Sequence, residues 1–510
     1  MKRFLFLSAA LVAVLSCGEK NDPDPTPVTP SAPTSITLSS SSFSVAQAGE
    51  TLSLTITAPA RPKLDGVPDW ISVKDGTFKD YKITVGLVVS ANSTYESREV
   101  TVTVTATGAS SVTFKVTQEG KTLVPDPTLP DNTATAMARK LGFGWNLGNE
   151  MEAHNDGNPA EDAWTGVLCT QATFDGVAAA GISSVRIPVT WINLIGEAPD
   201  YTLDATRLAR LKEIVGYAHN AGLTTIVNIH HDGAESKYWL SVAPGADNAA
   251  ITAKFAAVWK QLAEAFQDED DWLIFESCNE INDGGWGWSA EYRTAEGKKR
   301  QNDILNGWNQ TFVDVVRGTG GKNAIRWLGV PGYAADVTMT LDDGFVIPND
   351  PANKVMVAVH TYGPYEFGQT CAVNQWGHTR TVKLDDPSFG EEYYRELFNR
   401  LYTTWVAKGI PVYFGEFGCA NRTDDKGFAF QLYFLEYMAK AMHVFGMPGF
   451  IWDNGAKGSG NEIYGIIDHG TGAYMDATRG PKILSACLKG LTDTDTSYTL
   501  QSVYDLAPSN

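Results

Sequence analysis

Basic residues are scarce in this chain of 510 residues, because 40 Lys and Arg stand against 59 Asp and Glu and the formal net charge is −19. A nucleic-acid-binding protein needs a basic surface that displaces the counterions of the phosphate backbone, so this balance argues against that class. The hydrophobic content of 43 % is enough to build a large core, which excludes a chain that is disordered throughout. The length indicates two or three domains.

Cysteine is scarce as well, with six residues in the whole chain. They form no CxxC pair and no spacing typical of a metal site. One of them, Cys17, belongs to an N-terminal signal described below. The other five are scattered, and an odd number leaves at least one thiol free, so we predict no disulfide framework and expect buried, unreactive side chains at Cys169, Cys278, Cys371, Cys419 and Cys487.

Long apolar runs are absent except at the N-terminus, and no other stretch is long and apolar enough to cross a bilayer. Residues 1–3 are a basic start, and residues 4–15 have the length of a signal-peptide core. The pair Ser16-Cys17 that follows resembles a bacterial lipobox, in which the cysteine is diacylated. We therefore predict a lipoprotein signal peptide over residues 1–17, lipidation of Cys17, and anchoring to the cell outer membrane with the protein facing outwards. A plain cleaved signal is the alternative.

Two proline-rich linkers, at residues 18–33 and 122–133, divide the rest of the chain. Between them, residues 34–121 contain short segments in which apolar residues and Thr or Ser alternate, a pattern typical of β-strands. The clearest of these segments are residues 35–38, 52–56, 82–85, 100–104 and 112–116. We predict a small immunoglobulin-like β-sandwich for this region.

This region also resembles a known family, the BACON domain, an immunoglobulin-like module often found before carbohydrate-degrading enzymes. The resemblance is carried by Asp69, Trp70, Ile71, Asn92, Arg98 and the VTQEG segment at residues 116–120. It implies sugar binding, but only Trp70 and Tyr95 are aromatic candidates for it, and we expect Trp70 in the core. A spacer is therefore favoured over a sugar-binding module, and both interpretations stay open.

From residue 134 to the end, short apolar runs alternate with longer amphipathic stretches such as residues 208–221 and 251–266. The runs lie at residues 142–147, 184–188, 225–230, 272–277, 326–330, 354–359, 412–415 and 449–452. Eight strands alternating with helices predict an α/β fold, a (β/α)8 TIM barrel, over residues 134–510. A doubly wound sheet is the competitor, but it usually carries a glycine-rich phosphate turn, and neither GxGxxG nor GxxxxGK[ST] occurs.

Polar or aromatic residues stand at the carboxyl ends of seven of these runs. They are Trp145 and Asn146, Arg186, His230 and His231, Asn279 and Glu280, His360 and Tyr362, Glu416, and Trp452 and Asp453. In a barrel these ends converge on one face, where active sites lie. The sequence therefore predicts a functional site at that face.

Two carboxylates define the chemistry that such a site performs. Glu280 and Glu416 close the fourth and seventh runs, which places them on opposite sides of the barrel mouth. A protonated carboxyl that gives its proton to a leaving oxygen and an ionised carboxylate that attacks the anomeric carbon together cleave an acetal, so we expect Glu280 to have the higher pKa. We expect the neighbouring side chains to assist: a cation that keeps one carboxylate ionised, a hydroxyl that bonds to it, an amide that holds a sugar 2-hydroxyl, and an indole beneath a sugar ring. These are Arg186, Tyr362, Asn279 and Trp452.

The same residues are similar to glycoside hydrolase family 5, whose retaining (β/α)8 enzymes carry an acid/base after strand four and a nucleophile after strand seven. The motifs are SVRIP from residue 184, NIHHD from 228, FESCNE from 275, HTY from 360, GEFG from 415 and IWD from 451. The resemblance implies that Glu280 is the acid/base and Glu416 the nucleophile. It implies substrate binding by Arg186, His230, Asn279, His360, Tyr362 and Trp452, to which we add His231 and Asn149.

The segment GWNLGN at residues 144–149 resembles a subfamily rich in endoglucanases and xyloglucanases. The three residues that follow, Glu150, Met151 and Glu152, depart from that subfamily, which often has Thr-Leu-Asp there. Cys278 before the Asn-Glu pair is a second departure.

A protein at the cell surface meets polymers, so we expect an endo-acting enzyme that cleaves β-1,4-glucan, with xyloglucan or mixed-linkage glucan as variants. Five aromatic residues near the expected cleft either stack on sugars or pack the loops: Trp286, Trp288, Tyr365, Phe367 and Trp376. An endo-β-1,4-mannanase is the nearest alternative, and a non-catalytic surface glycan-binding protein is a less favoured one. We expect no metal, because no third ligand follows His230-His231-Asp232, and no cofactor, no nucleic acid and a monomer.

Overall fold

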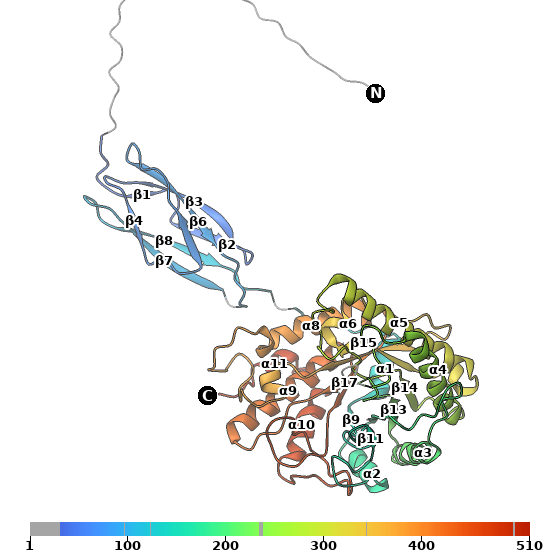
Figure 1. Cartoon of the computed structure of the whole chain (residues 1–510). Helices are drawn as coiled ribbons and strands as arrows, with labels where there is room; N and C mark the ends of the chain where they lie inside the picture. The colour runs from blue at the N-terminus through green and yellow to red at the C-terminus, as the bar shows by residue number, and fades with distance from the viewer. Residues whose placement is uncertain are drawn as a thin grey trace, which may run out of the picture. The chain divides into compact units, whose positions relative to one another are not determined.

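The computed structural model describes residues 31–509 except residues 96, 123, 234–237, 343 and 493–494. The predicted signal peptide, the lipidation site Cys17 and most of the linker at 18–33 lie outside the described residues. The chain divides into two compact units, residues 1–123 and residues 124–510 (Figure 1). Within the described residues no helix combines the length and the apolar character needed to cross a membrane.

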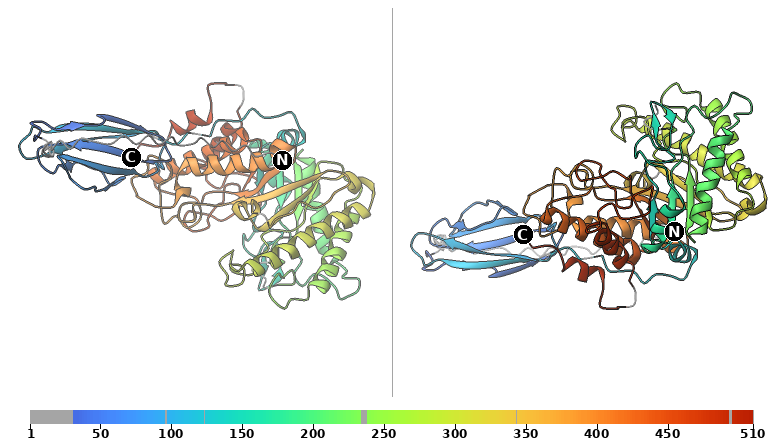
Figure 2. Two further views of the ribbon diagram at one scale, coloured as in Figure 1. Left: turned by 90° about the horizontal axis from the view of Figure 1, so that it is seen from above. Right: turned by 90° about the horizontal axis from the view of Figure 1, so that it is seen from below.

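The N-terminal unit consists of two four-stranded sheets (Figure 2). One has the order β1 (Thr37–Leu38), β3 (Glu50–Thr57), β6 (Lys82–Val89) and β5 (Ile71–Lys74), and the other has the order β2 (Ser42–Val45), β8 (Val112–Gln118), β7 (Arg98–Thr105) and β4 (Lys63–Asp65). The alternation of the sequence turns one face of each long strand inwards, as in β3, where Leu52, Leu54 and Ile56 are buried. The predicted sandwich is confirmed. Strands β2, β4 and β5 were not predicted, because each has only three or four residues and most of them are exposed.

The two aromatic side chains proposed for sugar binding in this unit are each covered by a cation. The guanidinium carbon of Arg98 lies 4.4 Å from the ring centroid of Trp70, and Trp70 packs partly against the sandwich core. The Nζ atom of Lys121 lies 5.4 Å from the ring of Tyr95. This arrangement favours the interpretation of the unit as a spacer.

The C-terminal unit is built on a closed barrel of eight parallel strands, which confirms the predicted (β/α)8 fold. The strands are β9 (Gly144–Asn146), β12 (Ser184–Ile187), β13 (Thr224–Asn228), β14 (Leu273–Glu276), β15 (Leu328–Asp336), β16 (Val355–Thr361), β17 (Val412–Phe417) and β18 (Gly449–Ile451). Each of them falls within or overlaps one of the eight predicted apolar runs. The hairpin of β10 (His154–Asn155) and β11 (Asn158–Pro159) follows β9.

Helices connect the strands around the barrel (Figure 1). The long ones are α1 (Thr133–Leu141), α2 (Gln171–Ala179), α3 (Ala205–Asn220), α4 (Asn248–Ala265), α5 (Ala295–Gly318), α8 (Glu391–Thr404), α9 (Asp425–Val444) and α10 (Gly480–Gly490). The short ones are α6 (Val337–Thr340), α7 (Tyr365–Gly368), α11 (Leu500–Tyr504) and the 3-10 turns η2 (Gly321–Ile325), η3 (Pro387–Phe389) and η4 (Val406–Lys408). Aspartates begin several of them, because a carboxylate at the N-cap accepts from a free backbone N–H, as Asp204 does from the N–H of Arg207 at 2.7 Å.

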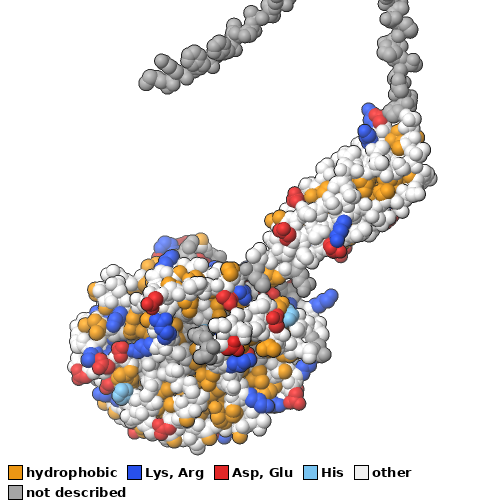
Figure 3. Space-filling model, turned by 180° about the vertical axis from the view of Figure 1, so that it is seen from behind, with side chains coloured by type: hydrophobic (Ala, Val, Ile, Leu, Met, Phe, Trp, Pro, Cys, Tyr) orange, Lys and Arg blue, Asp and Glu red, His pale blue; other side chains and the backbone are white. Residues whose placement is uncertain are grey.

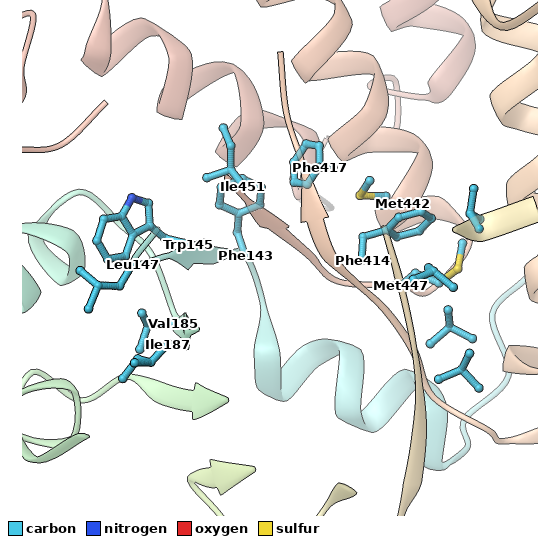
Figure 4. Close-up of a cluster of buried hydrophobic side chains, with 14 of the residues drawn as sticks. Phe143, Trp145, Leu147, Val185, Ile187, Phe414, Phe417, Met442, Met447 and Ile451 are labelled. Atoms are coloured by element: carbon cyan, nitrogen blue, oxygen red, sulfur yellow. The ribbon is translucent and has the colours of Figure 1, made fainter. Parts of the chain in front are cut away.

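The main hydrophobic core lies between the strands and these helices. Its side chains include Phe143, Trp145, Val185, Phe414 and Ile451, which alternate with residues that point into the barrel (Figure 4). Inside the barrel a second apolar cluster fills the end at which the strands begin, where residues such as Ile226, Ile274 and Phe450 pack against Leu141 of α1. Two residues further along β13 and β14, the inward positions change from apolar to polar. That change sets the depth at which the functional site begins.

The predicted linker at residues 122–133 contacts the barrel unit from residue 124 onwards. The side chain of Arg395, in α8, donates to the backbone oxygen of Val124 and to the carboxylate of Asp126. The hydroxyl of Tyr402 in the same helix donates to the backbone oxygen of Thr128. These contacts fasten the segment that leads into α1.

Candidate active site

A layer of buried polar side chains lies at the carboxyl ends of the barrel strands. It includes Asn146 from β9, Arg186 from β12, Asn228 from β13, Glu276 from β14 and Glu416 from β17, and none of these is more than 4 % exposed. Strand alternation explains the layer, because Asn228 and Glu276 stand two residues after the inward Ile226 and Ile274 and are paired in register. Buried charges of this kind are stable only when they are paired and hydrogen-bonded.

Arg186 is the centre of this layer. Its Nη1 atom lies 2.8 Å from Oε1 of Glu416, and its Nη2 atom lies 2.7 Å from Oε1 of Glu276. The same guanidinium donates to the side-chain oxygens of Asn146 and Asn279 at 3.1 and 2.8 Å. The predicted pairing of Arg186 with a carboxylate is therefore found, but Arg186 holds two carboxylates and not one.

Glu276 is a site residue that the sequence analysis did not identify. Besides Arg186, it accepts hydrogen bonds from Nδ2 of Asn228 at 2.8 Å and from the hydroxyl of Tyr413 at 2.6 Å. Burial by itself would raise the pKa of Glu276, but the charge and hydrogen bonds of Arg186 outweigh it and lower that pKa. An acidic residue within an otherwise apolar strand, two residues after an inward Ile, was the signal in the sequence.

Glu416 is held as a carboxylate by groups on two sides. In addition to Arg186, the hydroxyl of Tyr362 donates to Oε2 at 2.8 Å. Burial acts to raise the pKa of Glu416, but the charges of His360 and Arg186 and the bond from Tyr362 bring it below its ordinary value. The side chain is therefore ionised at neutral pH, which is the state that a nucleophile requires.

Glu280 has the opposite environment. Burial is the main cause that raises the pKa of Glu280, and the negative charge of Glu416 raises it further, against a hydrogen bond with His360. The Nδ1 atom of His360 lies 2.7 Å from Oε1 of Glu280 and 3.8 Å from Oε1 of Glu416. These directions agree with the expectation that Glu280 has the higher pKa of the two.

The separation of the two carboxyl groups limits the chemistry that they can perform. An oxygen of Glu280, an oxygen of Glu416 and a ring nitrogen of His360 lie within 4.8 Å of one another. Retaining glycosidases hold their two carboxyl groups about 5–5.5 Å apart, and inverting ones about 6.5–9.5 Å, to leave room for a water molecule. The two carboxyl groups are thus too close together for the inverting arrangement and are nearer to the retaining one.

His230 and Trp452 form a wall beside the carboxylates. Their rings are parallel within 5°, with centroids 6.0 Å apart, and Nδ1 of His230 lies 3.1 Å from Nδ2 of Asn228. Burial lowers the pKa of His230 well below its ordinary value, so its ring is neutral at neutral pH. His231 and Asn149 border the same hollow, so all ten predicted site residues lie together.

Asn149 is held towards the hollow by a tight turn. Its backbone has a φ of 65°, in the left-handed region that Asn tolerates better than most residues. The buried carboxylate of Glu152 closes this turn by accepting from the backbone N–H groups of Asn149 and Glu150. Glu152, one of the three residues that depart from the subfamily pattern, therefore stabilises this turn.

Two hollows meet at the carboxylates and form a cleft. One, of about 600 Å³, is bordered by Glu416, Asn279 and Trp452. The other, of about 540 Å³, is bordered by aromatic residues that include Trp286 and Trp288, and it does not include Glu416. Glu280, Tyr362 and Gln369 border both hollows.

The five aromatic residues predicted near the cleft divide into two groups. Trp286, Trp288 and Tyr365 border the smaller hollow with 43, 78 and 58 % of their surface exposed. Phe367 and Trp376 are fully buried, so their alternative role of packing the loops is the correct one. Both side chains lie in the main core, where their rings pack against the ring of Phe434 in α9.

Trp164 is a further aromatic residue at the cleft that the sequence analysis did not identify. It borders the larger hollow, and its ring lies 5.5 Å from that of His231 and 5.2 Å from that of His154. Its position, in a loop with no neighbouring catalytic motif, gave no signal in the sequence.

Among the described residues, two groups of side chains have the spacing of metal ligands. The first is Glu280, His360 and Glu416, but both oxygens of Glu416 already accept from protein donors. The second is Glu150, Glu161 and Cys169, in which Glu161 pairs with Arg210 and burial raises the pKa of the Cys169 thiol. Neither group is free to take an ion without breaking these contacts.

Comparison with known proteins agrees with this geometry. A family model described as cellulase, glycosyl hydrolase family 5, matches residues 146–458, and the BACON model matches residues 65–119. Endoglucanase A of Paenibacillus barcinonensis is 36 % identical over 343 residues, which are 64 % of this chain and 84 % of that protein.

Two solved structures extend the comparison. A GH5-4 broad specificity endoglucanase from Bacteroides salanitronis is 43 % identical with a TM-score of 0.67, and covers 74 % of this chain and 99 % of its own. A GH5 xyloglucanase from Bacteroides ovatus, in complex with a XXXG heptasaccharide, is 27 % identical with a TM-score of 0.61, and covers 90 % of this chain and 100 % of its own.

Proposed function

The chain belongs to glycosyl hydrolase family 5, and on that premise we propose that it is an endo-acting, retaining β-1,4-glucanase. The observation that carries the proposal is the pair Glu280 and Glu416, with carboxyl oxygens within 4.8 Å of each other and pKa values moved in opposite directions. This is the pair that double displacement needs.

The roles of the two carboxyl groups follow from their environments. Glu416, ionised beside Arg186 and Tyr362, attacks the anomeric carbon and forms a glycosyl-enzyme intermediate. Glu280, whose pKa is raised by burial, gives its proton to the leaving oxygen and then takes one from the water molecule that hydrolyses the intermediate. Asn279 is placed to hold the sugar 2-hydroxyl, because its amide oxygen is fixed by Arg186 and its NH₂ group is free to donate.

The two hollows bind the two halves of a glucan chain. The hollow that includes the nucleophile Glu416 holds the sugar whose anomeric carbon reacts, over the indole of Trp452. The hollow that includes Glu280 but not Glu416 holds the leaving chain against Trp286 and Trp288. Both hollows are open and together exceed the size of one sugar ring, which supports cleavage within a polymer. We propose β-1,4-glucan as the backbone, with xyloglucan and mixed-linkage glucan as accepted variants.

The test is release of reducing ends from mixed-linkage glucan, xyloglucan, carboxymethylcellulose, glucomannan and galactomannan. The wild type is compared with Glu280→Gln, Glu416→Gln and, as a matched control, Glu264→Gln, whose side chain lies on α4 and pairs with Lys260. We expect glucan cleavage in the wild type and the control, a loss of at least about 10³-fold in the two site variants, and a first product of unchanged anomeric configuration. Cleavage of mannans alone would make the protein a mannanase, and binding without cleavage would make it a glycan-binding protein.

Export and lipid anchoring are part of the same proposal. They are supported by the basic start, the apolar run at residues 4–15 and the pair Ser16-Cys17. A surface location on the outer membrane suits an enzyme whose substrate is a polymer. Metabolic labelling with palmitate should mark the wild type and not Cys17→Ala, and added protease should remove the activity from intact cells. Light scattering of the chain without residues 1–17 tests the expected monomer.

A further inference from the structure

Glu150 is paired with His469, which lies in the long segment after β18. Both side chains are fully buried, and Oε1 of Glu150 lies 3.1 Å from Nδ1 of His469. The hydroxyl of Thr165 also donates to Oε1 of Glu150 at 3.0 Å. No step of the proposed reaction uses this pair.

The second ring nitrogen of His469 faces another carboxylate. Its Nε2 atom lies 3.5 Å from Oδ1 of Asp453, the residue after Trp452. The side chain of Asp453 accepts from Nε1 of Trp145 and from the backbone N–H of Ile467, both at 2.8 Å. An imidazole ring whose two nitrogens both face carboxyl oxygens is favoured in the imidazolium form, in which each nitrogen carries a hydrogen.

The contacts of His469 with Glu150 and Asp453 join two segments that border the larger hollow. This is the hollow proposed to hold the reacting sugar, that is, the glycone side of the cleft. One carries Gly148 and Asn149 ahead of Glu150, and the other carries Trp452 ahead of Asp453. The two segments touch, because the backbone N–H of Gly148 donates to the oxygen of Asp453 at 3.0 Å. A Cβ atom at Gly148 would lie 2.9 Å from Cζ2 of Trp452, so the indole lies directly on this glycine.

We propose that His469 is a positioning residue, which as an imidazolium between Glu150 and Asp453 fixes the indole of Trp452 and the turn of Asn149 for binding of the reacting sugar. The inference rests on the proposed function, because it assigns a role to residues behind the proposed glycone subsite.

The pH dependence of stability gives an independent measure of the imidazolium. The charged groups that face His469 are Glu150 and Asp453, with Glu161 beyond Glu150, and the neighbouring Trp145 and Thr165 are neutral. Burial acts to lower the pKa of His469, but the two carboxylates outweigh it and raise the pKa from 6.5 to about 9. Because the pKa is raised in the folded state, its contribution to stability is complete below pH 6.5 and is lost as the pH rises through about 9.

The experiment measures binding of cellotetraose by calorimetry in the full-length Glu280→Gln enzyme, with activity of the wild type on glucan measured beside it. Into this parent we introduce His469→Gln, Glu150→Gln and the two together. The matched control is Arg317→Gln, which breaks a buried ion pair with Asp350, at 2.8 Å, at the opposite end of the barrel. Melting temperatures are recorded for all variants from pH 5 to pH 10.

We expect each single site variant to weaken binding by roughly tenfold, because it leaves a buried charge without its partner. The double variant should bind within about threefold of the parent, because two neutral amides can bond to each other. The control should lose melting temperature but not affinity. The loss of melting temperature in His469→Gln should be largest below pH 6.5 and should shrink above pH 9.

The inference would be overturned by any of three results. The affinity for cellotetraose could be unchanged in His469→Gln, the losses of affinity could add in the double variant, or Arg317→Gln could lose as much affinity as the site variants. A wild type that cleaves no glucan, with a parent that binds no cellotetraose, would instead remove the proposed function, and the inference with it. Because wild-type cleavage is measured separately, the two failures are distinguishable.

Discussion

Arg186 and Glu276 form an ion pair inside the barrel from which solvent is excluded. The Nη2 and Nε atoms of Arg186 lie 2.7 and 3.1 Å from the two oxygens of Glu276, and the two side chains are 0 and 1 % exposed. Glu276 therefore balances part of the charge that Arg186 presents to Glu416. Glu276 takes no direct part in bond cleavage, but through Arg186 it influences the pKa values of Glu416 and Glu280.

Replacing Glu276 by Gln should shift the whole pH profile. Without the negative charge, Arg186 acts more strongly on its surroundings, and the pKa values of Glu416 and Glu280 both fall. Both limbs of the plot of kcat/KM against pH should then move to lower pH. The free energy of unfolding should fall by about 3–5 kcal/mol, because a buried charge loses its partner. In the control Asp350→Asn, a similar loss of stability should leave the limbs in place.

Removing the hydroxyl of Tyr362 should shift only one limb. Activity falls at low pH when Glu416 takes a proton, and at high pH when Glu280 loses one. The bond from Tyr362 to Oε2 of Glu416 lowers the pKa of Glu416, so Tyr362→Phe should raise it and move the acidic limb to higher pH. We expect kcat to fall by about ten- to a hundredfold. A profile of unchanged shape would contradict the role given to this hydroxyl.

Two tryptophans near the cleft should respond to substitution in opposite ways. Trp288 is 78 % exposed beside the leaving-group hollow, whereas Trp376 is fully buried and donates from Nε1 to the backbone oxygen of Ser388 at 2.9 Å. Trp288→Ala should raise KM for polymers by several-fold and leave the melting temperature unchanged. Trp376→Phe should lower the free energy of unfolding by about 1–3 kcal/mol with little change in KM. Steady-state kinetics and urea denaturation separate the two cases.

Cysteine labelling provides a test of the packing. All five cysteines among the described residues are free, as expected, but Cys371 is only partly buried, whereas the others are buried. Burial raises the pKa of the Cys371 thiol, so its reaction should be slow. In a chain without residues 1–17, a thiol reagent should modify one group under native conditions and five in urea. Loss of the native reaction in Cys371→Ser would identify it, and two or more reactive thiols would contradict the packing.

The mixed surface of the catalytic unit agrees with the interpretation of the composition. Figure 3 shows acidic and basic side chains interspersed on the face in view, with apolar side chains in small groups between them. This face contains no basic stripe of the kind that binds nucleic acid.

The sequence was sufficient for the eight strands and for the face at which the ten candidate residues meet, because both depend on local patterns. Each barrel strand is a short apolar run that ends in a polar group, and parallel strands bring those ends to one face. It was not sufficient for Glu276 or Trp164. Glu276 lies inside an apolar run, where its direction into the barrel depends on strand register, and Trp164 lies in a loop whose path is set by packing.

The amino-acid sequence by itself therefore determined the order of the elements and the face on which Glu280 and Glu416 lie. Only the tertiary structure decided the protonation of these groups, since their pKa values depend on burial and on partners distant in the chain. It also decided which aromatic residues face the cleft and that Glu150 meets His469, 319 residues away. Periodicity records how a side chain is directed within its own element, whereas an electrostatic environment is created only when elements from the whole chain are packed together.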